Sequence, residues 1–376
     1  MNKCMIVFLG ALLAAVGAKA QTPKFRLVHK VTLPPNQEFG PKRYLHDDPR
    51  VLDRGRLLLF ANGLHEERDT FHILRLDSFQ RQKLRAPIAE FLAYHIELTG
   101  SGNKVIGLRL LFLDTTNQEA GLQLTLRDPG GMRLVYFLHW DLSRGRITRH
   151  VRLAEDDGST ERNRLRAIGY DANQRAFYFL KQQKGFGGSR EARVYVWQYK
   201  QLRQITRFAP NRRIKVAPIF DARRHRALVI EYGEMRESQP LGYLIDLQQG
   251  QVRSLRLPIT TYGAIFHPRL ERLYAYSSKS GELQQIDLST GRVERTLKVG
   301  VNGHALGIVA NGWLALVRNN QLQLYNLDTL KRGSSMATGR LARGFFHASG
   351  STIRNRRIIV KNGRMIFLLS VGTRGV

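Results

Sequence analysis

Cysteine is almost absent from this chain: Cys4 is the only one among 376 residues. It lies near the start of an N-terminal apolar run, so disulfides, thiolate nucleophiles and cysteine metal sites are excluded from everything that follows that run. Acidic residues are also scarce, with 30 Asp and Glu against 60 Lys and Arg, which gives a formal net charge of +30. A chain without disulfide bonds must be held together by its hydrophobic core.

Long apolar runs are missing after the first twenty residues, so no later transmembrane helix is predicted. At the N-terminus, Lys3 is followed by the apolar run Met5–Val16 and by small residues at Ala18 and Ala20. This order is typical of a secretory signal peptide spanning residues 1–20, and an uncleaved anchor is the alternative. We therefore expect one domain over residues 21–376, in the periplasm or secreted.

Helical periodicity is weak, because no 3.6-residue apolar pattern lasts longer than about two turns. Short runs rich in Val, Ile, Leu, Tyr and Phe recur instead, bounded by Gly, Asn, Asp or Ser. Such runs are typical of strands joined by tight turns. The clearest unit, Tyr262–Gly300, contains four of them, and Asp287 opens its last turn with a side chain that can cap it.

Turn markers similar to Asp287 recur along the chain at Asp77, Asp141, Gln198, Asp246 and Asn326. The intervals from 246 to 287 and from 287 to 326 are 41 and 39 residues, which fit a four-stranded propeller blade of about 40–50 residues. A further blade is expected from strands near both ends, at Phe25–Leu33, Gly344–Ala348, Arg357–Lys361 and Arg364–Val371. The sequence thus predicts an all-β fold, a seven-bladed β-propeller of four-stranded antiparallel blades closed by pairing the N- and C-terminal strands. Six or eight blades follow if one early unit is assigned differently.

The segment His267–Gly300, with HP, RLYAYS, IDLSTGRV and KVG, resembles a YVTN-type propeller repeat. The following Asn302-Gly303-His304-Ala305 resembles the start of the next repeat, and the resemblance covers residues 262–336. Proteins of this type include bacterial lactonases, heavy chains of quinoprotein amine dehydrogenases and exported propellers without a known reaction. The resemblance implies the fold and leaves the activity open, because function does not follow from fold.

Catalytic motifs are missing. No G-x-S-x-G nucleophile elbow occurs, and the glycine-rich segment 185–188 precedes a strand instead of the helix that a phosphate site needs. His46 and Asp47 are weak candidate metal ligands, with turn capping as the alternative. If the central channel is catalytic, His304 is the first candidate for acid–base work, beside Arg318 and Tyr262. No cofactor is predicted.

Topology predicts which loops share a face. In a propeller, the loops between second and third strands lie on the face where ligands usually dock, and we assign residues 63–69, 114–120, 181–191, 231–240 and 277–281 to these loops. Charged residues there form a predicted binding rim: Glu66, Glu67, Asp69, Glu119, Lys184, Glu231, Glu234, Glu237 and Lys279. A mainly acidic rim favours a cationic ligand or partner, and ordinary loop polarity is the alternative.

Three functions remain open at this point. The first is a binding module of the cell envelope, which takes a protein or small-molecule ligand at the channel face. The second is a lactonase-like or quinoprotein-type enzyme that uses the central channel. The third is a polyanion-binding protein, for which the charge of +30 would favour an acidic envelope surface. Nucleic acid is not expected as a partner, because an exported protein seldom meets it.

Overall fold

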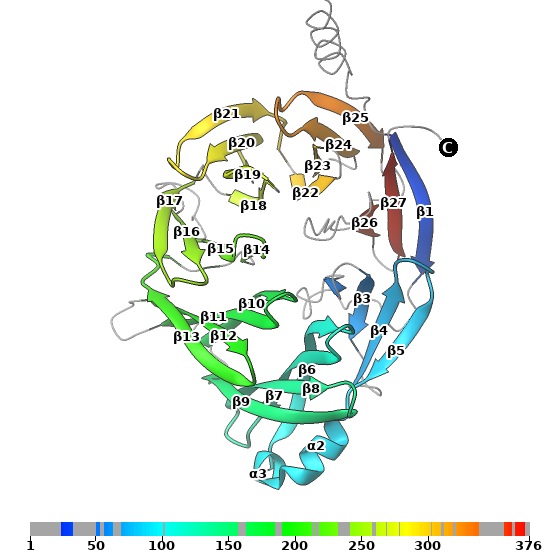
Figure 1. Cartoon of the computed structure of the whole chain (residues 1–376), viewed down its shortest axis with the longest axis vertical. Helices are drawn as coiled ribbons and strands as arrows, with labels where there is room; N and C mark the ends of the chain where they lie inside the picture. Colours follow the sequence, from blue (N-terminus) through cyan, green and yellow to red (C-terminus); the bar gives the residue numbers. More distant parts are fainter. Residues whose placement is uncertain are drawn as a thin grey trace, which may run out of the picture.

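The structure is a computed structural model. It describes residues 24–32, 50–52, 56–62, 69–100, 102–156, 163–184, 190–212, 214, 218–231, 241–257, 261–267, 269–277, 279–301, 303–309, 312–318, 321–337, 357–362 and 365–372. Among these residues the strands form six four-stranded antiparallel sheets and one three-stranded sheet. Figure 1 shows the sheets arranged around a ring, with the first strands toward the middle and the fourth strands at the perimeter.

Each four-stranded sheet is a meander of consecutive strands. The first three are β2 (Arg50–Leu52), β3 (Leu57–Asn62), β4 (Thr70–Arg75) and β5 (Arg81–Arg85); β6 (Lys104–Asp114), β7 (Glu119–Arg127), β8 (Arg133–Asp141) and β9 (Arg146–Asp156); and β10 (Asn163–Asp171), β11 (Ala176–Lys184), β12 (Arg190–Gln198) and β13 (Gln201–Phe208). The next three are β14 (Ile219–Asp221), β15 (Arg226–Ile230), β16 (Leu241–Asp246) and β17 (Val252–Arg256); β18 (Thr261–Phe266), β19 (Arg272–Ser277), β20 (Glu282–Asp287) and β21 (Val293–Lys298); and β22 (Gly303–Val309), β23 (Trp313–Arg318), β24 (Gln321–Asn326) and β25 (Arg332–Ala337).

The three-stranded sheet joins both ends of the chain. Its order is β1 (Lys24–Thr32), β27 (Met365–Gly372) and β26 (Arg357–Asn362), with β1 antiparallel to β27 from Lys24↔Gly372 to Thr32↔Met365. The expected strand Gly344–Ala348 lies outside the described residues.

The turn markers are confirmed. All six lie where the third strand of a sheet turns into the fourth, between β4 and β5 for Asp77 and between β24 and β25 for Asn326. The capping mechanism is present as well: Asp246 Oδ1 accepts the backbone N–H groups of Gln248 and Gln249, both at 2.8 Å. An Asp or Asn side chain that accepts these hydrogen bonds stabilises the turn locally, so the residues that follow it can vary.

Glycine supplies the left-handed position of these turns where it is present. Gly250 and Gly291, each four residues after the marker, have φ of 75° and 73°. After Asn326 the same place is taken by Leu330, with φ of 54°. Leu330 is 3% exposed and packs between the sheets, so its burial offsets the backbone strain of a non-glycine residue there.

The hydrophobic core lies between neighbouring sheets. The described core clusters each join residues of two consecutive sheets, as in the cluster of Phe137, Phe177 and Trp197. The sheets of β14–β17 and β18–β21 meet in the same manner through Leu228, Leu273 and neighbouring apolar residues. Packing sheet against sheet explains why second strands such as β15, whose five residues are all buried, read as nearly continuous hydrophobic runs.

Two short helices, α2 (Ile88–Tyr94) and α3 (Ile96–Thr99), connect β5 to β6 and were not predicted. They are too short to produce a sustained helical period in the sequence. Ile88 and Phe91 are the buried residues of α2. Figure 1 shows both helices outside the ring, beside β9. Among the described residues, no helix has the length and apolar character needed to cross a membrane.

The fourth strands carry much of the positive charge. We call their exposed basic side chains the basic belt: Arg81, Lys83, Arg85, Arg146, Arg149, Arg152, Arg203, Arg207, Arg253, Arg256, Arg295, Lys298 and Arg332. These strands lie at the outer edge of their sheets, where charged side chains discourage pairing with another chain.

One loop assignment is wrong. Residues 114–120 connect β6 to β7, which are the first and second strands of their sheet, so they do not form a second-to-third-strand loop. They belong with the tight turns at the other ends of the strands. The physical cause is the length of β6 and β7, which have eleven and nine residues. With such long strands, the turn between the first and second strands was assigned as a loop between the second and third.

Candidate functional site

The channel candidates lie on the inner side of two neighbouring sheets. Tyr262 is in β18, His304 is in β22 and Arg318 ends β23, with Gly303 paired to Arg318. Tyr262 and His304 are each the extra, unpaired residue of a β-bulge. In β18 the strand pairing shifts between Thr261 and Gly263, and in β22 it shifts between Gly303 and Ala305. The structure describes these three residues by their backbone alone.

Bulges often re-aim a side chain next to an active site. Here, however, the first strands β6 and β10 also have one-residue register shifts, between Val105 and Gly107 and between Ala167 and Gly169. The bulge is therefore a recurring feature of the inner strands, and it does not single out Tyr262 or His304. Their catalytic role stays a prediction.

The predicted rim is only partly described. Glu66, Glu67, Glu234 and Glu237 lie outside the described residues, as do the metal candidates His46 and Asp47. Lys184 ends β11, and Lys279 lies in the half-buried turn between β19 and β20. Asp69 precedes β4, and its Oδ2 forms a 2.7 Å ion pair with Arg85 Nε.

Two of the rim acids are buried. Glu231 is 3% exposed and accepts hydrogen bonds from the Tyr243 hydroxyl at 2.6 Å and from the Arg212 N–H at 3.1 Å. Glu119 is 7% exposed and begins β7. A carboxylate that is buried and hydrogen-bonded holds the fold together, so neither residue presents its charge to a ligand at an open rim.

Glu119 is the centre of a polar cluster between two sheets. Its oxygens lie 2.9 Å from Arg175 Nη2, 2.8 Å from the Tyr170 hydroxyl and 3.3 Å from His139 Nε2. The Tyr170 hydroxyl also lies 3.0 Å from Asp114 Oδ2. Glu119 and His139 belong to the β6–β9 sheet, whereas Tyr170 and Arg175 come from the next one, so the cluster joins the two sheets.

The electrostatics of this cluster are those of a fixed charge. Burial would raise the pKa of Glu119, but hydrogen bonds from its three donors outweigh burial and lower the pKa to about 2. Burial and the adjacent carboxylate raise the pKa of Tyr170. Both groups titrate far from neutral pH, whereas an acid–base catalyst needs a pKa near the working pH. The cluster is therefore a structural contact.

Similar polar contacts join the following sheets at the same level. Asp171, at the end of β10, lies 3.0 Å from His225 of the next sheet. Asp221, at the end of β14, lies 3.2 Å from Arg226, which also pairs with Glu271 of the sheet beyond. Asp114, Asp171 and Asp221 end the first strands of three consecutive sheets, so the sequence signal that was missed is an Asp at the first turn of these three sheets.

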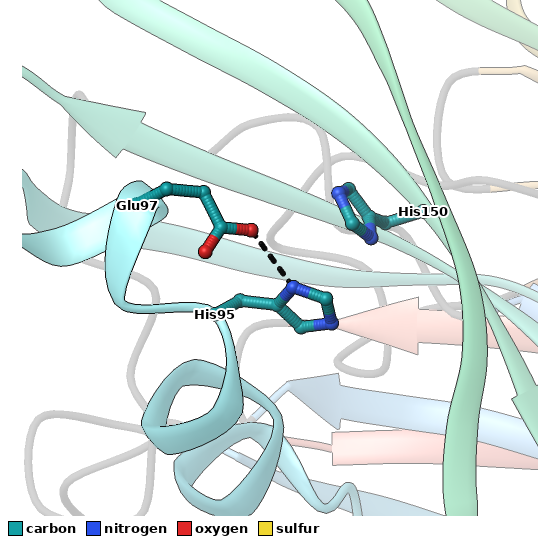
Figure 2. Close-up of side chains that lie close together, drawn as sticks. All are labelled: His95, Glu97 and His150. Atoms are coloured by element: carbon teal, nitrogen blue, oxygen red, sulfur yellow. Dashed lines mark hydrogen bonds and ion pairs between the residues drawn. The ribbon is translucent and has the colours of Figure 1, made fainter.

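A different cluster lies outside the ring. His95 is at the junction of α2 and α3, Glu97 is in α3 and His150 is in β9. We call these three residues the His95 cluster. His95 Nδ1 lies 2.8 Å from Glu97 Oε1, and the rings of His95 and His150 meet edge to face with centroids 4.5 Å apart. Figure 2 shows the His150 ring facing this pair from the strand.

His95 and His150 of the His95 cluster are half-buried, whereas Glu97 is exposed. Burial, together with the nearby His95, lowers the pKa of His150. The hydrogen bond from His95 lowers the pKa of Glu97. Among the described residues these three are the group of His and Glu side chains able to hold a metal ion. Sequence reasoning missed them because residues 97 and 150 lie on separate elements that only the packing of α2 on β9 brings together.

A hollow of about 630 Å³ lies between the outer strands β21 and β25. Its lining includes four basic residues, Arg295, Lys298, Lys331 and Arg332, and no acidic residue. The apolar residues of its lining are Leu297, Val299, Tyr325 and Leu330. The hollow therefore combines a partly apolar lining with positive charge.

No family model and no curated protein matches this chain. Among solved structures, a WD40 β-propeller chain of the mitotic checkpoint complex has a TM-score of 0.55 at 9% identity, with 93% of each chain covered. The computationally designed Ika8 protein has a TM-score of 0.47 at 9% identity, covering 83% of this chain and 92% of that one. The likeness to the first structure shows a β-propeller-like fold and nothing about activity. Membership of the YVTN type stays a prediction.

Proposed function

We propose that this protein is an exported, seven-bladed β-propeller that serves as a binding module of the cell envelope and holds an acidic protein segment against the outside of its ring. A β-propeller-like fold often mediates protein binding, which makes a binding role the starting expectation. The observation that carries the proposal is the basic hollow between β21 and β25.

Charge and shape both support an acidic occupant. Arg295, Lys298 and Arg332 are exposed on the hollow, and its lining contains no carboxylate that would neutralise them. Opposite charge across an interface steers encounter and selects the partner, and a hollow of about 630 Å³ gives room for a side chain of that partner.

Part of this surface is held in position before any partner arrives. Arg295 Nη1 donates to the carbonyl oxygen of Asp328 in the next sheet at 2.7 Å. Arg253 makes the equivalent contact one sheet earlier, to the carbonyl oxygen of Ser289 at 2.9 Å. An arginine whose side chain is already ordered loses less conformational entropy on binding, so the hollow is partly preorganised.

The test uses a fluorescent poly-glutamate peptide and its anisotropy as a function of salt concentration. We expect the affinity to fall as salt rises, because exposed charges are screened. The double variant Lys298→Glu/Arg332→Glu is expected to lose at least about tenfold in affinity. The control is Arg203→Glu/Arg207→Glu, which changes the net charge equally on β13, away from the hollow. Equal losses in both variants would show that general charge binds the peptide, and the proposed site would be wrong.

Seven blades closed by the chain ends are part of the proposal. The support is the register of eight residue pairs between β1 and β27, together with the six four-stranded sheets. Pairing the N-terminal strand with a C-terminal strand brings both ends of the chain into one sheet through backbone hydrogen bonds, and it leaves fewer free edges.

A further inference from the structure

The His95 cluster has no role in the proposed docking surface. Its three side chains come from the α2–α3 connection and from β9, in a different part of the ring from β21 and β25. Two imidazoles and one carboxylate offer ligand atoms that all lie within 4.8 Å of one another.

We propose that His95, Glu97 and His150 bind a divalent transition-metal ion, and that Zn²⁺ is the ion these donors fit best. Imidazole nitrogen and carboxylate oxygen are common zinc donors, and two histidines with one glutamate form a known type of three-ligand zinc site. Cysteine donors are not needed for such a site, in keeping with a chain that has none after Cys4.

The geometry requires little rearrangement. Zinc binds nitrogen and oxygen ligands at about 2.0–2.2 Å, which puts neighbouring ligand atoms of a tetrahedral site about 3.3 Å apart. His95 Nδ1 and Glu97 Oε1, at 2.8 Å, are already closer than this, and all three ligand atoms fall within 4.8 Å. Glu97 is on the surface, with 62% of its side chain exposed, so it can adjust by rotation alone.

The two histidines are held on an aromatic support. Phe91 is 6% exposed and its ring centroid lies 4.5 Å from that of His95 and 5.5 Å from that of His150. The backbone N–H of His95 donates a hydrogen bond to the Phe91 carbonyl oxygen. His95 therefore caps the C-terminal end of α2, which fixes its backbone position. A site supported by packed side chains on a strand and a helix junction is better positioned than one on a free loop.

The fourth coordination position faces solvent. The Glu97 side chain is 62% exposed and that of His95 is 33% exposed, whereas the buried Phe91 packs against both histidine rings. Zinc with three protein ligands keeps water or another donor in the fourth position, whereas structural zinc sites fill all four positions with protein ligands. The bound ion would therefore be accessible from outside the ring.

Other histidine–carboxylate pairs in the described chain differ from this cluster. His225 lies 3.0 Å from Asp171, a separation like that of His95 and Glu97, but no second imidazole accompanies it among the groups able to hold a metal. His225 therefore provides a matched control, because its variant removes one histidine of the same kind while leaving the His95 cluster intact.

The experiment is a Zn²⁺ titration of the chelator-treated full chain by isothermal calorimetry. We expect one tight site per chain. Glu97→Gln and His150→Asn should each weaken binding by at least about tenfold, while His225→Asn binds as the wild type does. Glu97→Gln keeps the shape of an exposed side chain, so its effect does not depend on folding.

Co²⁺ offers a second readout, because its visible absorption bands intensify on tetrahedral coordination. The bands are expected in the wild type and in His225→Asn, and to be lost in Glu97→Gln and His150→Asn. The proposal is overturned if the wild type binds no Zn²⁺, or if Glu97→Gln and His150→Asn bind it with unchanged affinity and stoichiometry.

Discussion

Replacing Glu119 by glutamine should make the protein less stable at neutral pH and remove part of its sensitivity to acid. Glu119 is 7% exposed and links two sheets through Arg175, Tyr170 and His139. Glutamine has nearly the same shape but carries no charge, so the substitution isolates the ionised carboxylate from the packing of the side chain.

The magnitude follows from the pKa. In the folded chain the pKa of Glu119 falls from its ordinary value of 4.5 to about 2. One pKa unit corresponds to about 1.4 kcal/mol, so the ionised carboxylate stabilises the fold by about 3 kcal/mol. Because the folded pKa is the lower one, this contribution is fully present above about pH 5. It is lost as the pH falls toward 2.

The assay is urea unfolding of the wild type and Glu119→Gln at pH 7 and pH 3. The difference in unfolding free energy should be about 3 kcal/mol at pH 7 and less than half of that at pH 3. The control is Glu191→Gln, whose partner Arg193 lies at 3.0 Å on the surface, and which should change the stability by less than about 1 kcal/mol. A wild-type advantage that stays constant between the two pH values would refute the role assigned to the charge.

Two further predictions concern the backbone and the N-terminus. Gly281→Ala should destabilise the protein by about 2–4 kcal/mol, because φ is +67° and the added Cβ would lie 2.5 Å from the Gly300 carbonyl carbon. Gly145→Ala, at φ +62° with no atom within 4 Å, should cost only about 1 kcal/mol, and equal urea midpoints for the two variants would contradict this. N-terminal sequencing of the exported protein should begin at Gln21, and a chain that retains Met1 would show that residues 1–20 are not removed.

Local structure was predictable from the sequence to a large extent. The Asp and Asn markers indicated the third-to-fourth-strand turns because their side chains cap the turn within a few residues, as Asp246 and Asp287 do. The strands near both ends of the chain were likewise recognisable from short apolar runs, and β1 pairs with β27. Interactions between residues close in sequence leave a pattern that can be read without the fold.

Contacts between distant segments had no such pattern. The acidic rim depended on loop assignments, and Glu119 and Glu231 proved to be buried groups with partners from other strands. His95 and His150 are 55 positions apart and meet only because Phe91 packs α2 toward β9. The composition of the chain determined a disulfide-free and strongly basic protein, and the spacing of short apolar runs indicated an all-β fold. The tertiary structure alone decided which charges are neutralised between sheets and which remain exposed, because burial and pairing depend on neighbours that the sequence order does not reveal.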